Sequence, residues 1–491
     1  MPPQAPKSGL VRSFGLKMAI IMVMSAIIGS GVFKKVAPMA DELGHAGWVI
    51  LAWVLSGVIV LFGVLSIAEL AALFPHAGGP FSWLEKIYGK LISFLYGWSC
   101  FTVVQSAAIA SVAFVFAGAL NTFMPLPHLS SEWERLSVLG IHLFNNMGAK
   151  IVSCLLIISL TVANIRGVEK GGWISLIFTF SIVVCIALIV AMAFGSAVGS
   201  WHTFATSSAE YVGNGVSALT FVGIMVIAMR HAFWGYEGWI ALGFIGEEIK
   251  NPERNMPRAM AYGIILILLL YALINTAYLY VMPIDEMSRA MQLDENNIAA
   301  VLVVNKIFGN GGAFVVSAMI LISTFGCTNA TILVSSRIYY AMAREGWFFK
   351  SVARTHSKHR TPSRALVYQC VWACLLTCSG SFSLLTDLVI IAAFIFYGLI
   401  VFGVVVYRKK QPSIYRPYKT WGYPVVPIGF TLFCLVLLAI SLVESPGKSL
   451  VGFALIISGL PFYLFWRQKK RTGTFFRKKQ AGYRRNPDRP V

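Results

Sequence analysis

Charged side chains are scarce in this sequence of 491 residues. Lys, Arg, Asp and Glu together make up 12% of the chain, whereas soluble globular proteins carry about 25%. Hydrophobic residues make up 57%, and the mean hydropathy is +0.73. A soluble domain could not bury that much apolar surface, and the apolar residues gather in stretches of about 18 or more, which is typical of membrane-spanning helices. The composition therefore predicts an all-α polytopic membrane protein.

Acidic residues are the rarer of the two charged classes, and this asymmetry is informative. The chain has 20 Asp and Glu against 40 Lys and Arg, which leaves a formal net charge of +20. The basic residues flank apolar runs and follow no pattern typical of DNA or RNA binding, so we expect no nucleic-acid partner. Basic flanks are typical of the cytoplasmic side of membrane helices, where they also attract anionic lipid. The expected surroundings are therefore membrane lipid.

Cysteine is absent from the polar loops. The eight cysteines all lie in apolar runs, so nothing predicts a disulfide framework. Cys370, Cys374 and Cys378 recur every four residues and share one helix face, where we interpret them as small packing residues rather than as a metal site. The sequence also contains no HExxH motif, no nucleophile elbow and no phosphate-binding loop. We therefore expect no catalytic residue, no metal, no cofactor and no enzyme activity.

The apolar stretches divide into twelve predicted helices. Their approximate bounds are 14–39, 47–73, 91–123, 150–165, 171–197, 214–246, 259–282, 312–343, 363–379, 384–407, 422–443 and 449–466. With the N-terminus placed in the cytoplasm, 32 of the 40 Lys and Arg residues fall on the cytoplasmic side, as the positive-inside rule requires. An even number of helices returns the C-terminus to the same side. We expect a multi-pass protein of the plasma (inner) membrane with both termini in the cytoplasm.

The same pattern divides the chain into four predicted parts. Residues 1–13 form a short cytoplasmic segment, and residues 14–407 form a core of ten helices. Residues 408–466 add a cytoplasmic loop and two accessory membrane helices. Residues 467–491 form a basic cytoplasmic tail that we expect to rest on the inner leaflet.

Two of the predicted helices contain glycines near their middle. Residues 214–246 would extend about 50 Å as one helix, against a hydrocarbon core of ~30 Å, and Gly235 and Gly238 flank the charged Glu237. The first helix carries Gly29-Ser30-Gly31. Glycine favours unwound backbone, which a membrane tolerates only where protein or a water-filled cavity covers it. If the core is two repeats of five helices, these interruptions correspond and indicate a substrate site near the bilayer midplane. The alternative is that the glycines only allow helices to pack closely.

Seven short segments carry a recognisable pattern in a fixed order along the chain. They are 26–33 (AIIGSGVF), 68–70 (AEL), 74–80 (FPHAGGP), 234–239 (WGYEGW), 246–252 (GEEIKNP), 335–337 (SSR) and 343–346 (AREG). Together they resemble the signatures of the amino acid–polyamine–organocation superfamily, over about residues 14 to 465, and most closely those of the L-amino-acid transporter family. The resemblance implies the leucine-transporter-type fold, a 5+5 inverted repeat with helices 1 and 6 broken, in carriers that mostly exchange amino acids without sodium.

The resemblance also implies a substrate site at the two breaks. Free N–H groups at one end of a broken helix suit the carboxylate of an amino acid, and free C=O groups at the other end suit its ammonium group. The predicted substrate-binding residues are Ile27, Ile28, Gly29, Ser30, Gly31, Phe233, Trp234, Gly235 and Glu237. N–H groups around Gly29–Gly31 and the Ser30 hydroxyl would hold the carboxylate. The carbonyls expected to accept from the ammonium group are those of Ile27, Phe233, Trp234 and Glu237. Trp234 corresponds to an aromatic lid over the substrate, and the alternative for it is ordinary packing.

Three features of that family are missing. The loop 122–149 contains no cysteine, so a disulfide-linked partner subunit is not expected, and no Asn-x-Ser/Thr sequon lies in an outside loop. Both absences favour a bacterial-type carrier that acts alone. No Lys or Arg lies between Lys170 and Arg230, although the family often has a fifth-helix Lys that stands in for sodium. The coupling ion therefore stays open. One possibility is a sodium ion held by the hydroxyls of Ser181, Ser323 and Thr324.

Two charged residues, Glu237 and Arg230, are predicted to lie inside the membrane, where an unpaired charge is costly. Glu237 coincides with the predicted substrate site. Arg230 either reaches the outer vestibule or a distant acid, or it contacts the outer gate or the substrate carboxylate.

We predict a secondary active amino-acid transporter, an exchanger that works by alternating access. The alternatives are a carrier of polyamines or amines, a proton- or sodium-coupled amino-acid symporter, and a nutrient sensor that keeps the transporter fold.

Overall fold

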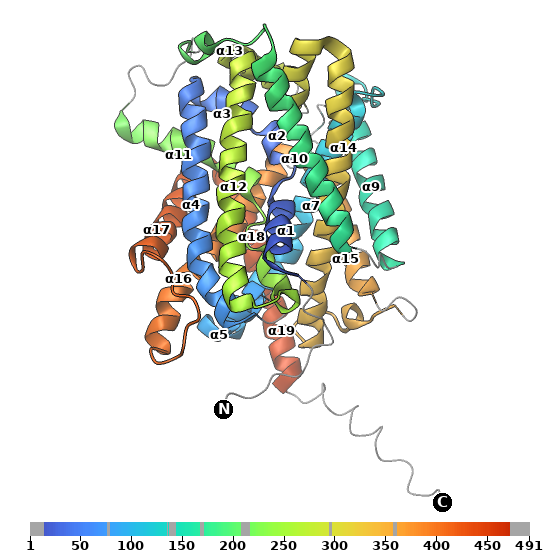
Figure 1. Ribbon diagram of the computed structural model, residues 1–491. Coiled ribbons are helices and arrows are strands. Elements are labelled where there is room, and N and C mark those ends of the chain that lie inside the picture. The colour runs from blue at the N-terminus through green and yellow to red at the C-terminus, as the bar shows by residue number, and fades with distance from the viewer. Residues whose placement is uncertain are drawn as a thin grey trace, which may run out of the picture.

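The computed structural model describes residues 14–75, 79–134, 136, 144–166, 171–207, 217–293, 297–356 and 361–471. Figure 1 shows a bundle of long, roughly parallel helices with short helices at both ends. In this described part of the chain there is no strand, and the two isolated bridges join Phe14 to Ile249 and His45 to Ser207. The predicted all-α architecture is confirmed. The predicted segments 1–13 and, beyond Arg471, the basic tail lie outside the described residues.

Nineteen α-helices, one π-helical turn and three 3₁₀ turns make up the described chain. They are α1 (Leu16–Ile27), α2 (Gly31–Lys34), α3 (Val36–Leu43), α4 (Ala46–Leu73), α5 (Gly79–Tyr88), α6 (Lys90–Ser99), the π-turn η1 (Cys100–Val104), α7 (Gln105–Asn121), α8 (Ser131–Glu134), α9 (Met147–Ile165), α10 (Gly171–Gly195), η2 (Trp201–Phe204), α11 (Ala218–Tyr236), η3 (Ala241–Glu248), α12 (Pro252–Val281), α13 (Ile284–Leu293), α14 (Ala299–Arg344), η4 (Lys350–Ala353), α15 (Ser363–Ser379), α16 (Phe382–Lys410), α17 (Val425–Glu444), α18 (Pro446–Ile457) and α19 (Gly459–Arg471).

The twelve predicted runs all coincide with helices, and ten of them are long and apolar enough in the described chain to cross a membrane. The two that fall short are informative. In the first run, α1 has only 12 residues because the helix breaks after Ile27. In the ninth, α15 has 17 residues.

One predicted boundary was wrong. The eighth helix was expected to begin near residue 312, but α14 begins at Ala299 and bends at Gly309, where φ is 64° and ψ is −160°. The first part of α14 has a lower hydropathy because it contains Asn305, Lys306 and Asn310. The apolar pattern therefore did not include it. The polar helix α13 at the same end was not predicted either.

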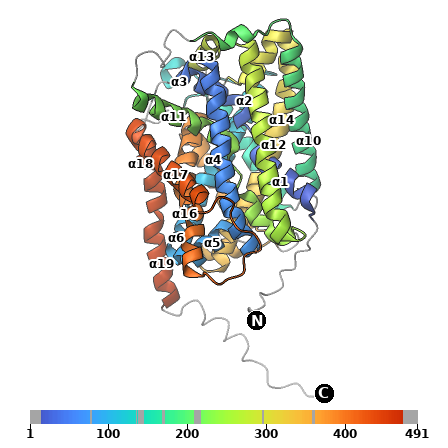
Figure 2. The same ribbon diagram turned by 60° about the vertical axis from the view of Figure 1, so that its left-hand side comes forward.

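The bundle has two distinct ends. Helices α3 and α13 lie at the upper end in Figures 1 and 2, and α5 and the end of α19 lie at the lower end. The start of the described chain is also held at the lower end, because Phe14 exchanges backbone hydrogen bonds with Glu248 and Lys250. Both ends of the described chain therefore lie on one side of the bundle.

Two groups of helices enclose the centre. Helices α1, α4, α11 and α12 pack on one another, and α7, α9, α14 and α15 form a second group. Helix α16 packs on both groups through α4 and α7, and 78% of its apolar window is buried, against 33% for α17. The broken helices α1 and α11 therefore face the second group across the middle of the bundle, and α16 closes one side.

Candidate functional site

The first helix is broken at its glycines. α1 ends at Ile27, Ile28 has an extended backbone with ψ of 99°, and α2 begins at Gly31. The N–H groups of Gly29, Ser30 and Gly31 have no backbone acceptor among the described residues. A helix that restarts in this way leaves N–H donors at its new end, where a negative group is favoured.

The second break lies at Glu237. α11 ends at Tyr236, Glu237 is extended with ψ of 144°, and the chain continues into the 3₁₀ turn η3. Gly238 has φ of 103°, in the region that favours glycine. A Cβ atom on Gly238 would also come within 2.2 Å of the Ala26 carbonyl oxygen. Glycine is therefore required here by both conformation and space.

The two breaks touch each other. A Cβ atom on Gly31 would come within 2.5 Å of the Gly235 Cα atom, and one on Gly235 would come within 2.7 Å of the Trp53 ring. Neither position has room for a side chain. These glycines therefore also allow close packing, as the alternative predicted. The same contacts bring the two breaks together.

A cavity of about 120 Å³ lies where the breaks meet α7 and α14. Six of the nine predicted site residues line it: Ile27, Gly29, Ser30, Gly31, Trp234 and Glu237. Ser25 on α1 and Phe244 in η3 also line it. The cavity is large enough for a small solute.

The other three predicted residues lie behind the cavity wall. Ile28 is fully buried. Phe233 packs on Phe394 and Phe433, with ring centroids 4.7 and 5.4 Å away. The Gly235 carbonyl accepts a hydrogen bond of 2.9 Å from the Tyr271 hydroxyl. These residues shape the site without facing the cavity.

The Glu237 carboxylate accepts hydrogen bonds from the Tyr397 side chain and from the backbone of Gly238. The Tyr397 hydroxyl of α16 donates a hydrogen bond of 2.5 Å to Glu237 Oε1, and the Tyr397 ring packs edge-on against Trp239 at 4.8 Å. A carboxylate accepts two or more hydrogen bonds when it is well satisfied. The Glu237 carboxylate also lines the cavity, where a cation that enters can approach it.

Sequence reasoning missed the walls supplied by α7 and α14. Gln105, Ala108 and Val112 line the cavity from α7, and Cys327 and Thr331 line it from α14. The π-turn η1 directly precedes Gln105 and changes the register of that helix, a feature that is frequent at functional sites. Apolar periodicity does not reveal a π-turn, so no signal in the sequence indicated which face of this helix meets the cavity.

The upper side of the cavity is closed. Trp234 donates from Nε1 to the Ser30 hydroxyl at 3.3 Å, and its ring meets Phe382 edge-on at 6.2 Å. The ammonium groups of Lys34 and Lys35 lie 4.4 and 4.8 Å from the centre of the Phe382 ring. Two aromatic layers and two lysines thus separate the cavity from the upper end.

Arg230 has a buried acidic partner. Arg230 pairs with Asp387, whose Oδ1 atom lies 3.6 Å from Arg230 Nε, and both side chains are buried. The distant acid anticipated for Arg230 is therefore Asp387 on α16. Glu237 bonds to Tyr397 instead of pairing with Arg230.

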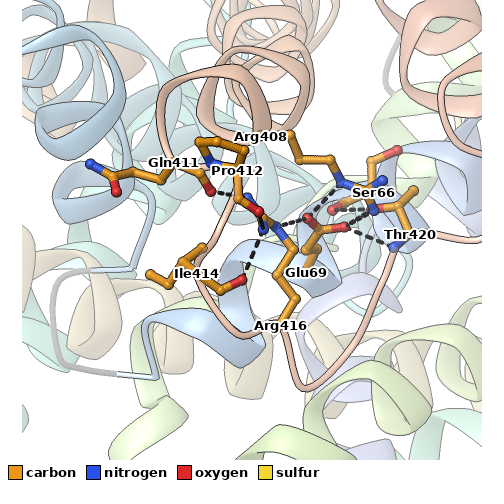
Figure 3. A network of polar contacts seen from close by, with 8 residues as sticks. All are labelled: Ser66, Glu69, Arg408, Gln411, Pro412, Ile414, Arg416 and Thr420. Carbon is orange, nitrogen blue, oxygen red and sulfur yellow. Dashed lines mark hydrogen bonds and ion pairs between the residues drawn. The ribbon is translucent and has the colours of Figure 1, made fainter.

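A second buried acid lies at the lower end. Glu69 on α4 is 1% exposed and accepts from five donors: Arg408 Nε and Nη2, Arg416 Nε, and the backbone N–H and hydroxyl of Thr420. Figure 3 shows these side chains converging on the carboxylate from α16 and the loop that follows it. Within the motif 68–70 the sequence drew attention to Glu69 but not to its partners.

The chain was compared with known proteins. The family model described as amino acid permease matches residues 14–466. The serine/threonine exchanger of Bacillus subtilis is 30% identical over 94% of this chain and 98% of its own length. The human large neutral amino acids transporter small subunit 2 is 28% identical over 96% of this chain and 84% of its own length, and the human cystine/glutamate transporter is 26% identical over 96% and 89%.

Proposed function

This chain belongs to the amino acid permease family, and from that premise we propose that it is a secondary active amino-acid exchanger that works by alternating access. The family and the relatives named above are transporters, not enzymes. The chain itself is a multi-pass membrane protein. Substrate would be held between the breaks of α1 and α11.

The observation that carries this proposal is the cavity at the junction of the two breaks. It offers unpaired N–H groups at Gly29–Gly31 on one side and the Glu237 carboxylate on the other. An amino acid carries a carboxylate and an ammonium group on one carbon, and these charges match the two sides of the cavity. The close contact of Gly31 with Gly235 holds the two breaks next to each other, and with them the N–H groups and the carboxylate.

The lower end of the bundle is proposed to face the cytoplasm, with both termini there, in a plasma (inner) membrane. The supporting observation is the distribution of Lys and Arg, which gather in the loops of the lower end. Because Trp234 lines the cavity and packs against Phe382 on its upper side, the described arrangement is proposed to be a state closed to the outside.

The first test is exchange of labelled amino acid in proteoliposomes. We expect Gly31→Leu to abolish exchange while the protein still inserts, because the side chain would meet the backbone of Gly235 at 2.5 Å. Gly223→Leu on α11 is the matched control, since a Cβ atom there meets nothing within 4 Å. Near-normal exchange by a well-expressed Gly31→Leu protein would remove the first break from the site.

A second test concerns Glu237 and the class of substrate. A carboxylate of low exposure attracts a cation more strongly than in water, so Glu237 is proposed to favour substrates with a second positive charge. Glu237→Gln should lose most exchange of cationic amino acids and less exchange of neutral ones, because their ammonium group can still use backbone carbonyls. Competition by neutral and cationic amino acids, putrescine, agmatine and cadaverine measures this and distinguishes an amino-acid carrier from an amine carrier.

The rival account of Glu237 is structural. If it serves only to hold α16 through Tyr397, Glu237→Gln and Tyr397→Phe should slow neutral and cationic substrates alike. Equal losses in both classes would therefore end the substrate-recognition role.

Two further properties of the carrier are its coupling ion and its need for a partner subunit. We propose a carrier that acts without a disulfide-linked subunit, because the loop 122–149 has no cysteine. For sodium, Ser323 has an unpartnered buried hydroxyl but Thr324 donates to the Ile320 carbonyl at 2.7 Å. Exchange that is unchanged when choline replaces sodium at constant pH would eliminate sodium coupling.

A further inference from the structure

The wall of the cavity across from the two breaks is formed by α7 and α14. Gln105, Ala108 and Val112 line it from α7 at positions i, i+3 and i+7, which share one helix face. Residues with a matching helical spacing line it from α14, namely Cys327, Ala330, Thr331 and Val334. Two helix faces therefore border the space that the breaks leave open.

This wall lies close to the groups proposed to bind the backbone of an amino acid. A Cβ atom on Gly29 would come within 3.2 Å of Cys327 Sγ, so α14 stands directly against the first break. The N–H groups of Gly29–Gly31 and the Glu237 carboxylate lie on the side of the breaks. The rest of the cavity, which α7, α14 and η3 border, is left for the side chain of the substrate.

Most of the side chains on the two helix faces have little to offer a polar group. The alanines and valines present only hydrocarbon. Thr331 has a hydroxyl, which donates to the Cys327 carbonyl at 2.9 Å. Its hydrogen is therefore used within α14, and its oxygen can only accept. Cys327 adds a thiol, which is a weak hydrogen-bonding group.

Gln105 differs from these residues because its amide is unused. Its side chain takes part in no hydrogen bond with the described residues, although an amide has two N–H donors and an oxygen that accepts. Gln105 is partly exposed, whereas Val104 and Ser106 beside it are buried. It lies near the middle of the membrane span Lys90–Asn121, where an amide without a partner is costly. Water or a solute in the cavity is therefore needed to satisfy it.

The size of the cavity limits the side chain that can reach Gln105. The cavity volume is about 120 Å³, and an apolar cavity of about 150 Å³ holds a benzene molecule. The backbone atoms of an amino acid alone fill most of such a space. Room is therefore left for a short side chain, of roughly two or three heavy atoms.

We propose, on the basis of the function proposed above, that Gln105 selects the substrate by hydrogen-bonding to a hydroxyl or amino group on a short side chain. The carrier therefore prefers short polar amino acids to apolar ones of the same shape. An apolar side chain would displace water from the Gln105 amide without replacing its hydrogen bonds, which leaves the amide unpaired. A site built to hydrogen-bond its substrate rejects an analogue that lacks the polar group.

The experiment compares amino acids of equal shape in proteoliposomes that contain the full chain. L-serine is paired with L-2-aminobutyrate, and L-threonine with L-valine, as competitors of the labelled amino acid that the wild type exchanges fastest. The members of each pair differ only in a hydroxyl against a methyl group. None has a charged side chain, so Glu237 does not contribute to the difference. We expect each polar member to compete at a concentration about tenfold lower than its apolar partner.

Replacement of the amide tests whether Gln105 causes that preference. Gln105→Met keeps an unbranched side chain of similar length without the amide, so both ratios should fall to about one. A purely structural defect would instead slow exchange of all four amino acids and leave the ratios unchanged. Gln411→Met is the matched control, because Gln411 is exposed at the end of α16, and it should keep the wild-type ratios.

A second variant should move the preference rather than remove it. Gln105→Asn keeps the amide but draws it back by one methylene group. L-homoserine, whose hydroxyl lies one methylene group further out than that of L-serine, should therefore gain on L-serine as a competitor. Poor folding cannot produce such a gain.

The outcomes separate this inference from the proposed function. Absence of exchange of any amino acid by the wild type would overturn the proposed function and the inference together. Exchange in which the wild type treats the members of each pair alike would overturn the role of Gln105 alone. A preference that persists in Gln105→Met, or a ratio of L-homoserine to L-serine that stays unchanged in Gln105→Asn, would do the same.

Discussion

Helix α16 carries a charged cluster near each end, and the two clusters differ in how well their groups are paired. At the lower end, the Glu69 carboxylate has five hydrogen-bond donors. At the upper end, Arg230 has two N–H positions without an acceptor among the described residues, and Asp387 is shared by two cations. The lower cluster is saturated and the upper one is not.

The difference indicates two roles for one helix. A buried carboxylate with every lone pair used is held in one arrangement, because any movement exposes unpaired charge. The Glu69 cluster therefore fastens α16 and its following loop to α4. In the upper cluster Arg230 is held by an ion pair of 3.6 Å and Nη1 has no acceptor among the described residues, so fewer hydrogen bonds fix this end of α16. Tyr397, between the two, links the same helix to Glu237.

The largest expected effect comes from breaking the saturated cluster. Glu69→Gln removes the carboxylate that five donors share and leaves Arg408 and Arg416 close together without it. Loss of one partner of a buried ion pair costs about 3–5 kcal/mol. Thermal unfolding in detergent measures this, with Glu444→Gln as the control. Glu444 is exposed, so its variant should stay within about 0.5 kcal/mol of wild type. Similar stabilities of the two variants would contradict the fastening role.

An intermediate effect is expected from the unsaturated cluster. Asp387→Asn removes the carboxylate that Arg230 and Lys448 share, but Lys448 can turn to water because it is 39% exposed. We expect a loss of about 2–3 kcal/mol, below that of Glu69→Gln. Thermal unfolding in detergent measures this beside Glu69→Gln, and a loss as large as that of Glu69→Gln would contradict the ranking.

The smallest effect sharpens the comparison from within the lower cluster. Thr420→Val removes only the hydroxyl donor to Glu69 Oε2 and keeps the shape of the side chain and the backbone N–H bond of 2.8 Å. Because four of the five donors remain, the expected loss is about 1 kcal/mol. Thermal unfolding of Thr420→Val and of Glu69→Gln, both in the presence of urea, measures the ratio of their two losses in stability. A loss as large as that of Glu69→Gln would mean that the donors do not act additively.

Much of the architecture was predictable because it depends on properties local to the chain. Apolar runs predict membrane helices, and the glycines around Ser30 and Glu237 predicted the two interruptions. The polar start of α14 was missed, since Asn305 and Lys306 interrupt the apolar pattern without ending the helix. Six of the nine predicted site residues face the cavity, whereas Phe233 and Gly235 pack behind it. Side-chain direction at a break depends on backbone angles that the sequence does not specify.

The buried charges show the limit of such prediction most clearly. Glu69 is more than three hundred positions from both Arg408 and Thr420 along the chain, yet all three share one hydrogen-bond network. Asp387 on α16 likewise meets Arg230 on α11, far away along the chain. No local pattern reports a partner that far away.

By itself, the sequence determined that this chain crosses the membrane many times and where two helices unwind, because hydropathy and glycine content act through neighbouring residues. Only the tertiary structure decided which wall each residue faces, that Glu237 bonds to Tyr397 and that Arg230 has unpaired donors beside Asp387. The reason is physical: pairing and burial are properties of groups brought together from distant helices, and they exist only once the helices have packed.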